Sequence, residues 1–504
     1  MKNCLPNKYQ RDKAKQNAYN ILMNQKYQKN IENGCLEINS CEQLRNLTFI
    51  NKFNVWKLSI DQCPDVEPEL SNNNIRELAI QCCQLLTIDG LVLKNLEVLN
   101  VSGNKIGIIK KINGFKRLKY LNLSGNYLQD LCNLNSLENL IQLNISRNQI
   151  KNIQQLKNLA NLYELDLSSN QNIDISALKY LVSLTNLKIS NCNITDVTAV
   201  QYLVNLTELD ISMNKITEIN ALNKLNNLEK LNAFKNCIQT LIDLRQANKL
   251  KDIDVSWNFD IDISNPIEQI TKLSTINNNL INIEFISKYE NLEHLNISNN
   301  QGLDIVPLKN LNKLLYLNLS KCSLKNISPL EYLQNLKELE LNQNNSINIA
   351  PLQYLVNLTK LSISKCGLLE ISALRPLTNL ELLIISNNSI IYLSPLEKMK
   401  KLKSIQYQYN KIIKVNIMND YILNNYQYQY SPSEIELRLA NKMDAIDKTT
   451  NILKQIQINR NSFCKYPSKQ MLATLFQNSI HNQLQFQNTV ISHFNQLNSA
   501  DIYQ

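Results

Sequence analysis

The chain has 504 residues, a formal net charge of +10 and a hydrophobic share of 44%, which is ordinary for a globular protein. Glycine and proline are scarce, at 8 and 11 residues, which excludes collagen-like and proline-rich scaffolds. Asparagine is over-used at roughly one residue in six, and no apolar run approaches the ~18 residues of a membrane span.

The first segment, residues 1–30, is basic and has a helical pattern. It holds seven lysines and arginines against one aspartate, and Ala14, Ala18 and Leu22 recur at four-residue spacing. This predicts a helical cap on the first repeat. The alternatives are an arm that contacts a membrane surface or an acidic partner, and disorder. The segment lacks the apolar stretch of a secretory signal, so we expect a cytoplasmic location, with the nucleus as the alternative.

A repeat governs the chain from residue 31 to residue 415. Residues 118–128 have the pattern L-x-x-L-x-L-x-x-N-x-L, and the pattern returns near residues 140, 162 and 206. Aligning it gives 18 repeats and 17 intervals; 14 intervals span 22 residues, and the others span 20, 21 and 20. We call the asparagine-type residue of each repeat its rung position. The rung positions are 41, 63, 83, 104, 126, 148, 170, 192, 214, 236, 258, 278, 300, 322, 344, 366, 388 and 410.

The pattern of each repeat has a direct structural meaning. Alternating leucines predict a short strand with one buried face, which is covered only when neighbouring repeats stack. The rung asparagine is expected to bond loop backbone through its buried amide. The remaining residues allow short 3₁₀ pieces, helped by prolines at 329, 351 and 395. The predicted fold class is α/β: a curved solenoid with a parallel sheet on its concave face, 3₁₀ turns on its convex face and helical ends.

The cysteines invite a metal or disulfide hypothesis, but six of the twelve occupy rung positions. These six are Cys41, Cys63, Cys83, Cys192, Cys322 and Cys366. We predict that a buried thiol replaces the asparagine amide there. The chain has no C-x-x-C pair and only three histidines, so we expect no metal and reduced thiols.

The last segment, residues 416–504, departs from the repeat. Residues 431–434 form a capping box with proline at the first helical position, and apolar residues then recur at helical spacing. A second such run follows Pro467. We predict two amphipathic helices. They either cap the last repeats or form a partner-binding or self-association module over residues 431–497.

The repeat resembles the leucine-rich-repeat family in its 22-residue class, which includes a regulatory subunit of protein phosphatase 1 and the bacterial internalins. The resemblance covers residues 31–415 and includes stretches such as Asp174-Ile-Ser-Ala-Leu178. It implies a horseshoe scaffold that binds partner proteins, with phosphatase regulation as one specific possibility.

Signatures of catalysis are missing from the sequence. We find no GxxxxGK[ST], GxGxxG, HExxH or GxSxG motif. We therefore expect no enzymatic activity, no cofactor and no small-molecule substrate.

Residues 31–410 carry a net charge of about +1 and show no basic stripe, so nucleic acid is not an expected partner. N-x-S sequons begin at strand positions that include 122, 144, 296 and 318, where glycans would cover the concave face.

The concave face is the expected binding surface. Positions four and two before each rung should point outward from the sheet, and the latter is serine in most repeats. That serine row is expected to serve the sheet. Carboxylates beside aromatic side chains in the middle repeats are typical of interface anchors. The predicted partner-binding residues are Glu164, Asp166, Glu208, Asp210, Phe234, Asp252, Asp254 and Trp257.

Two functional hypotheses follow. The first is a non-catalytic scaffold that docks a partner protein on the concave sheet, with a phosphatase catalytic subunit as one candidate. The second is a structural protein that oligomerises through its C-terminal helices. A face that is merely solvated, with no dedicated partner, is the alternative to both.

Overall fold

The structure is a computed structural model that describes residues 22–23, 25–265 and 267–412. Contacts divide the chain into two units, Met1–Ile422 and Leu423–Gln504, and every described residue belongs to the first. Most of the predicted N-terminal helix and both predicted C-terminal helices, including the self-association segment 431–497, lie outside the described residues. Within the described residues, no helix is long and apolar enough to cross a membrane.

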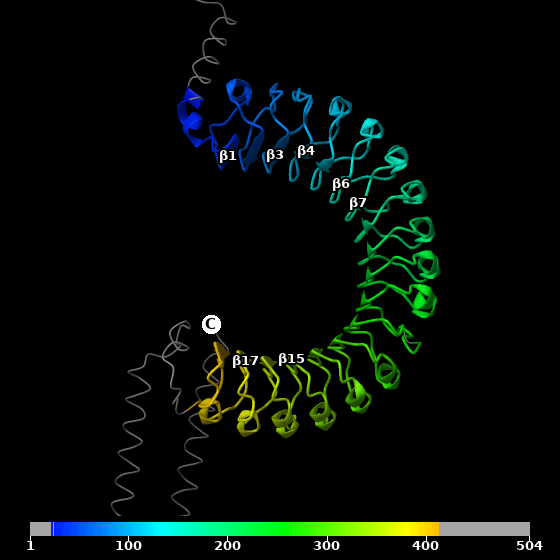
Figure 1. The fold of residues 1–504 in the computed structure, drawn as a ribbon, viewed down its shortest axis with the longest axis vertical. Helices are drawn as coiled ribbons and strands as arrows, with labels where there is room; N and C mark the ends of the chain where they lie inside the picture. Colours follow the sequence, from blue (N-terminus) through cyan, green and yellow to red (C-terminus); the bar gives the residue numbers. More distant parts are fainter. Residues whose placement is uncertain (1–21, 24, 266, 413–504) are drawn as a thin grey trace, which may run out of the picture. The chain divides into compact units, whose positions relative to one another are not determined.

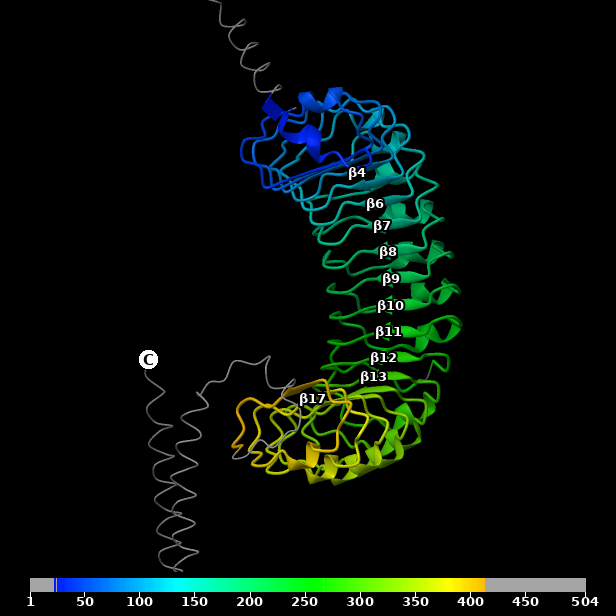
Figure 2. The ribbon, with the colours of Figure 1, turned by 60° about the vertical axis from the view of Figure 1, so that its left-hand side comes forward.

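The first unit contains one parallel sheet of 18 strands in which each strand pairs with the next in sequence. Figure 1 shows these strands on the inner side of an arc, and Figure 2 shows β6–β13 stacked one after another. The predicted solenoid is therefore confirmed. The strands are β1 (Cys35–Asn39), β2 (Lys57–Asp61), β3 (Glu77–Gln81), β4 (Val98–Asn100), β5 (Tyr120–Asn122), β6 (Gln142–Asn144), β7 (Glu164–Asp166), β8 (Asn186–Lys188), β9 (Glu208–Asp210), β10 (Lys230–Asn232), β11 (Asp252–Asp254), β12 (Lys272–Ser274), β13 (His294–Asn296), β14 (Tyr316–Asn318), β15 (Glu338–Glu340), β16 (Lys360–Ser362), β17 (Leu382–Ile384) and β18 (Ser404–Gln406).

The leucines of the repeat form one shared interior. Leu121 is in register with Leu143, and Leu143 with Leu165, and each is 2% exposed. A second aliphatic residue, two positions later in each repeat, is also buried, as Leu123 and Ile145 illustrate. Burying each such side chain contributes about 1.5–3 kcal/mol before the opposing entropy is counted. A strand alone cannot bury this surface, so the stack stabilises each member.

The rung asparagines join neighbouring repeats through three groups. The Nδ2 of Asn148 donates to the carbonyl oxygens of Leu123 in the preceding repeat (3.0 Å) and of Ile145 in its own (3.1 Å). Its Oδ1 accepts the backbone N–H of Leu128 at 3.0 Å. Asn214 and Asn300 repeat this arrangement. Each rung amide therefore satisfies backbone groups that the turn after the strand leaves unpaired.

The prediction that cysteines replace rung asparagines is confirmed. The Sγ of Cys192 bonds the carbonyl of Leu167 at 3.4 Å, and that of Cys322 bonds Ile297 at 3.4 Å, as an amide would. Both thiols are fully buried. Burial raises the pKa of each of these two thiols to about 11.

Short 3₁₀ segments line the outer side of the arc (Figure 1). In the described part of the chain, every 22-residue interval has one, and the intervals of 20 and 21 residues at 63–83, 83–104 and 258–278 have none. Removing one or two residues thus leaves too little chain for the 3₁₀ turn. Prolines begin four of the segments, including the three predicted ones. The segments are η1 (Gln28–Asn30), η2 (Thr48–Lys52), η3 (Ile112–Gly114), η4 (Leu134–Ser136), η5 (Gln154–Leu156), η6 (Ser176–Tyr180), η7 (Thr198–Tyr202), η8 (Asn220–Lys224), η9 (Ile242–Gln246), η10 (Glu284–Lys288), η11 (Val306–Asn310), η12 (Ser328–Tyr332), η13 (Ala350–Tyr354), η14 (Ser372–Leu374) and η15 (Ser394–Leu396).

The described end of the N-terminal segment packs on the first repeat. Met23 and Tyr27 are buried, and the Tyr27 ring stacks on Phe49 with 6.0 Å between ring centroids. The Tyr27 hydroxyl also lies 3.3 Å from the Sγ of Cys41 at the first rung. These contacts cover apolar surface that no preceding repeat would cover.

Candidate functional site

Two rows of side chains point outward from the concave sheet. We call the residues six before each rung the first row and those four before it the second row. In β7, for example, Glu164 of the first row is exposed, Leu165 is buried and Asp166 of the second row is half-buried. This alternation follows from the two-residue period of a strand. The outward placement predicted for the second row is confirmed.

The structure places the six predicted carboxylates on three strands that are not adjacent. Glu164 and Asp166 lie on β7, and equivalent pairs lie on β9 and β11. The registers align Glu164 with Asn186, then with Glu208, Lys230 and Asp252. Acidic strands therefore alternate with β8 and β10, each of which contributes one lysine and one asparagine to the two rows.

The second row has a structural role that the sequence reasoning missed. Oδ1 of Asp166, Asp210 and Asp254 accepts, in each case at 2.9 Å, the backbone N–H two residues later. Asparagine makes the same bond at 100, 122, 144, 232, 296 and 318. The recurring order Asn/Asp-x-Ser in the sequence could have predicted this hydrogen bond between a side chain and the backbone. The turn requires only a side-chain oxygen, so the negative charge of an aspartate exceeds what the fold needs.

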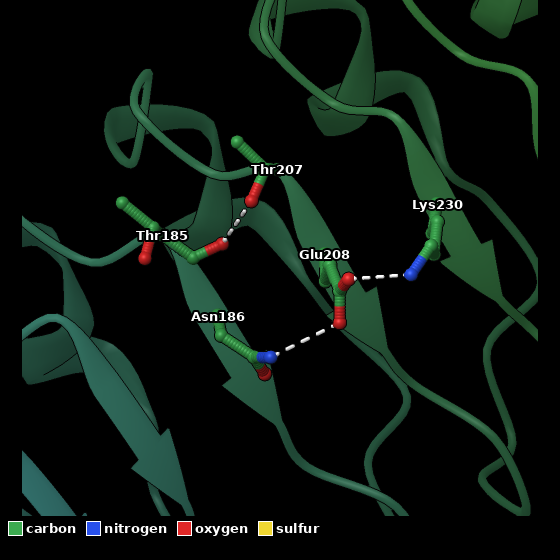
Figure 3. Close-up of polar contacts among 5 residues, drawn as sticks. All are labelled: Thr185, Asn186, Thr207, Glu208 and Lys230. Atoms are coloured by element: carbon green, nitrogen blue, oxygen red, sulfur yellow. Dashed lines mark hydrogen bonds and ion pairs between the residues drawn. The ribbon is translucent and has the colours of Figure 1, made fainter.

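Glu208 is engaged within the chain at both carboxylate oxygens. Its Oε1 pairs with Nζ of Lys230 at 2.7 Å, and its Oε2 accepts a hydrogen bond from Nδ2 of Asn186 at 3.1 Å; both contacts are drawn in Figure 3. Immediately before β8 and β9, Oγ1 of Thr207 donates to the carbonyl oxygen of Thr185 at 3.1 Å (Figure 3). The hydrogen bond to Glu208 raises the pKa of Lys230. The sequence could have indicated this ion pair. Glu208 and Lys230 are one repeat of 22 residues apart, which places them opposite each other on adjacent strands, as it does Glu338 and Lys360. Such exposed pairs contribute little to stability.

Three aromatic rings form a cluster at the end of β10 and β11. Trp257 lies edge-on to Phe234, with 6.5 Å between ring centroids, and to Phe259 at 6.2 Å. Trp257 is 38% exposed and Phe259 is 55% exposed. We call Phe234, Trp257 and Phe259 the aromatic cluster. Phe259 was not among the predicted residues, because it follows the rung directly and occupies no outward strand position.

Trp257 belongs to a third row, the residues one before each rung, which we call the edge row. Every residue of this row from Ser40 to Tyr409 has a left-handed backbone, and φ is +59° at Trp257. Glycine, asparagine and other small or polar residues fill most of the row. A tryptophan there costs about 1–2 kcal/mol of backbone strain that glycine would avoid. Exposed Met213 occupies the same row two repeats earlier and was also missed.

The prediction that the serine row points outward is wrong for several repeats. Ser146, Ser212, Ser256 and Ser298 are at most 9% exposed. The reason is that strands β4–β18 end at the second row, so the two-residue alternation does not reach the serine. In β1–β3 the strand extends two residues further, and there this position is half-buried or exposed.

Two hollows lie towards the N-terminal side of the predicted site. One of about 330 Å³ covers β4–β8 and is lined by amides such as those of Asn122 and Gln142 together with Glu164 and Asp166. Another of about 800 Å³ lies between exposed Trp56 and Tyr120, near Arg76. Only Glu164 and Asp166 of the predicted residues contribute to either hollow. Within the described residues, no cluster of histidine, cysteine and carboxylate side chains could hold a metal ion.

Comparisons with known proteins agree with this architecture. A family model described as leucine-rich repeats (2 copies) matches residues 94–136, 138–180 and 182–224. No curated protein sequence matches the chain. An internalin, InlF of Listeria monocytogenes, is 29% identical with a TM-score of 0.51, over 60% of this chain and 85% of that one.

Two other solved structures share the fold at lower identity. A repeat protein of Leptospira interrogans is 24% identical with a TM-score of 0.54, over 75% of this chain and 90% of that one. TLR13, solved in complex with ssRNA13, is 20% identical with a TM-score of 0.52, over 76% of this chain and 69% of that one. At these identities the likeness shows the fold alone.

Proposed function

The chain is a leucine-rich-repeat protein, and we propose that it acts as a non-catalytic scaffold whose concave sheet binds a partner protein. The observation that carries this proposal is the exposed aromatic cluster beside the carboxylates of β11. Exposed aromatic side chains are the commonest anchors of protein interfaces, because a rigid ring buries a large area at small entropic cost.

Binding without catalysis fits the setting of the carboxylates. A general acid or base needs a pocket that removes water and shifts its pKa. Glu164 lies exposed on an open sheet, Asp166 is half-buried, and both oxygens of Glu208 are held by neighbouring side chains. These groups are arranged to meet a complementary surface.

A protein partner is favoured over nucleic acid by charge. The TLR13 structure contains ssRNA13, so the fold accommodates RNA in that protein. In this chain the first and second rows of β7–β11 hold six carboxylates and two lysines. A phosphate backbone would meet net repulsion there, whereas nucleic-acid-binding surfaces carry excess positive charge.

We also propose an intracellular location for this function. Five N-x-S sequons begin in the second row of the concave face, on β4, β5, β6, β13 and β14. Glycans at these positions would cover the proposed binding surface. Fractionation of cells that express a tagged chain, with glycosidase treatment, tests this: a glycosylated secreted form would contradict it.

The test of the proposed function is capture of a partner by the full chain, followed by mass spectrometry. Trp257→Ala combined with Asp254→Ala should lose the partner while the fold persists, because neither side chain belongs to the buried core and only one backbone cap is removed. Asn318→Ala combined with Lys321→Ala is the matched control, since it removes a second-row cap and an edge-row side chain elsewhere. A phosphatase catalytic subunit is one partner that this experiment would identify. Capture that is equal in both double variants would refute the site.

A further inference from the structure

The aromatic cluster is an apolar surface that the fold does not require. Phe234 replaces the serine found at its position in most repeats, and Trp257 replaces the glycine or polar residue of most edge-row positions. The rings contact one another yet stay partly exposed, and the carbonyl oxygen of half-buried Ile276 in the next repeat accepts the backbone N–H of Trp257 at 2.8 Å. The cluster therefore offers contact area to something outside the described residues.

Negative charge beside the aromatic cluster favours a positively charged ligand. Asp254 precedes Trp257 by three residues, and Asp210 lies two strands away in the same row. The backbone cap of this row is made equally well by asparagine, so three aspartates add charge without a structural need. Together the two rows of β7–β11 carry a net charge of −4 in a chain whose net charge is +10.

The spacing of the charges restricts the occupant further. Acidic strands alternate with β8 and β10, so successive acid pairs are separated by two strand spacings, or about 9.6 Å. In a polyproline II segment every third residue lies on the same side, with a rise of about 9.3 Å per three residues. An extended strand brings side chains to one side every two residues, or about 6.8 Å, which does not match.

We propose that the aromatic cluster and the aspartates beside it bind an arginine-containing polyproline II segment of the partner, which crosses β7–β11 with an arginine at every third residue. Guanidinium groups would pair with Asp166, Asp210 and Asp254, and the segment would pack on Trp257, where an arginine can also stack on the indole. This inference rests on the proposed function and names the chemistry of its partner.

The test uses the full chain and synthetic peptides. The chain has two tryptophans, so Trp56→Phe leaves Trp257 as the only tryptophan, whose fluorescence is excited selectively at wavelengths where the 21 tyrosines do not absorb. A peptide of four Arg-Pro-Pro units should change Trp257 fluorescence, and raised salt should weaken its binding. A Glu-Pro-Pro peptide should not bind. A peptide with the same composition but four contiguous arginines should bind about tenfold more weakly, because only some of its charges can face the sheet.

Variants that remove the negative charge but keep the side-chain oxygen test the effect of charge without breaking the backbone hydrogen bond. The triple change Asp166→Asn, Asp210→Asn and Asp254→Asn should weaken binding of the Arg-Pro-Pro peptide, measured by calorimetry, by about tenfold or more. The control triple change Asp174→Asn, Asp196→Asn and Asp304→Asn alters net charge equally at caps that precede 3₁₀ segments on the outer side, and should not weaken it. Trp257→Asn should weaken binding while relieving the left-handed strain, so thermal stability should not fall.

Several outcomes would overturn the inference. These are equal binding of the two arginine peptides, an unchanged affinity in the acidic triple variant, or a Trp257 signal produced instead by oligouridylate or by a second copy of the chain. If the peptide fails but Trp257-dependent capture of a protein persists, this inference falls and the proposed function stands. If capture is also insensitive to Trp257, both fall.

Discussion

At the scale of the residue, asparagine and aspartate complete the backbone of many repeats at up to four positions. Beyond the rung and second-row positions, Oδ1 of Asp174 accepts the N–H of Ser176 at the start of η6, and Nδ2 of Asn205 donates to the carbonyl of Val182 in the preceding repeat. Equivalent bonds recur along the chain. These bonds account for the recurrence of asparagine and aspartate at these positions of the repeats.

Thr275 is a residue whose replacement should stabilise the chain. It stands at a buried aliphatic position, is fully buried, and its Oγ1 has no hydrogen-bond partner among the described residues. Thr275→Val removes that hydroxyl at nearly constant shape, so the free energy of unfolding should rise by about 1–2 kcal/mol. Urea unfolding measures this. Ile297→Thr, at the equivalent position of the next repeat, should lower stability; a lower midpoint for Thr275→Val would contradict the argument.

The buried rung thiols should be unreactive and should make stability fall at high pH. Thiols of Cys192 and Cys322 have a pKa of about 11 in the folded chain, whereas an unfolded thiol titrates near 8.5. Between these values only the unfolded state ionises, so stability that is full below about pH 8.5 declines as pH rises towards 11. Cys192→Asn, which restores the usual rung residue, should reduce this decline.

Mass spectrometry after maleimide labelling at neutral pH checks the same thiols independently. Label should enter exposed Cys82 and Cys237 of the native chain and reach Cys192 only on unfolding. Native labelling of Cys192 at a comparable rate would show that the repeat opens locally or that the thiol is not buried.

At the scale of the element, Tyr289 compensates for the short interval at 258–278. No 3₁₀ segment lies between β11 and β12 among the described residues. Tyr289 of the following repeat is fully buried, and its hydroxyl donates to the carbonyl oxygen of Ile263 in the shortened loop at 3.2 Å. Most repeats have leucine at the position of Tyr289. The larger ring therefore fills space and satisfies a carbonyl that the missing turn leaves open.

Restoring the usual residue at this position should therefore destabilise the chain. Tyr289→Leu should lower the free energy of unfolding by about 2–4 kcal/mol, because it leaves a cavity and an unpaired carbonyl. Tyr289→Phe is the matched control, since it keeps the buried ring and removes only the hydroxyl that bonds the carbonyl oxygen of Ile263. Thermal unfolding of both variants decides the point, and an equal or smaller loss for Tyr289→Leu would contradict it.

At the scale of the whole molecule, the described repeats contact mainly their neighbours, so damage should remain local. Leu209→Ala in β9 removes a side chain that is 2% exposed and should cost about 2–5 kcal/mol. Hydrogen exchange should accelerate in β8–β10 and change little in β14–β16. Leu339→Ala in β15 should give the opposite distribution. Uniform acceleration in either variant would show that the solenoid unfolds as one cooperative body.

The sequence was sufficient for the features that the repeat period determines. The stacked sheet, the buried cysteines at the rungs and the outward second row all follow from a 22-residue interval and a two-residue alternation. It was insufficient where the period stops applying: the serine row lies beyond the strand end, and Phe259 lies beyond the rung. Which partner contacts Glu164 or Trp257 could not be derived, because surface complementarity depends on a second molecule.

The rung amides give the stack a direction. Oδ1 and Nδ2 of Asn148 satisfy the N–H of Leu128 and the carbonyl of Leu123, both of which belong to the repeat that precedes it. During synthesis from the N-terminus, a newly made repeat would therefore keep open backbone groups until the next 22 residues emerge from the ribosome. A nascent chain would always carry one unfinished repeat at its growing end, and a stalled ribosome would display it to chaperones.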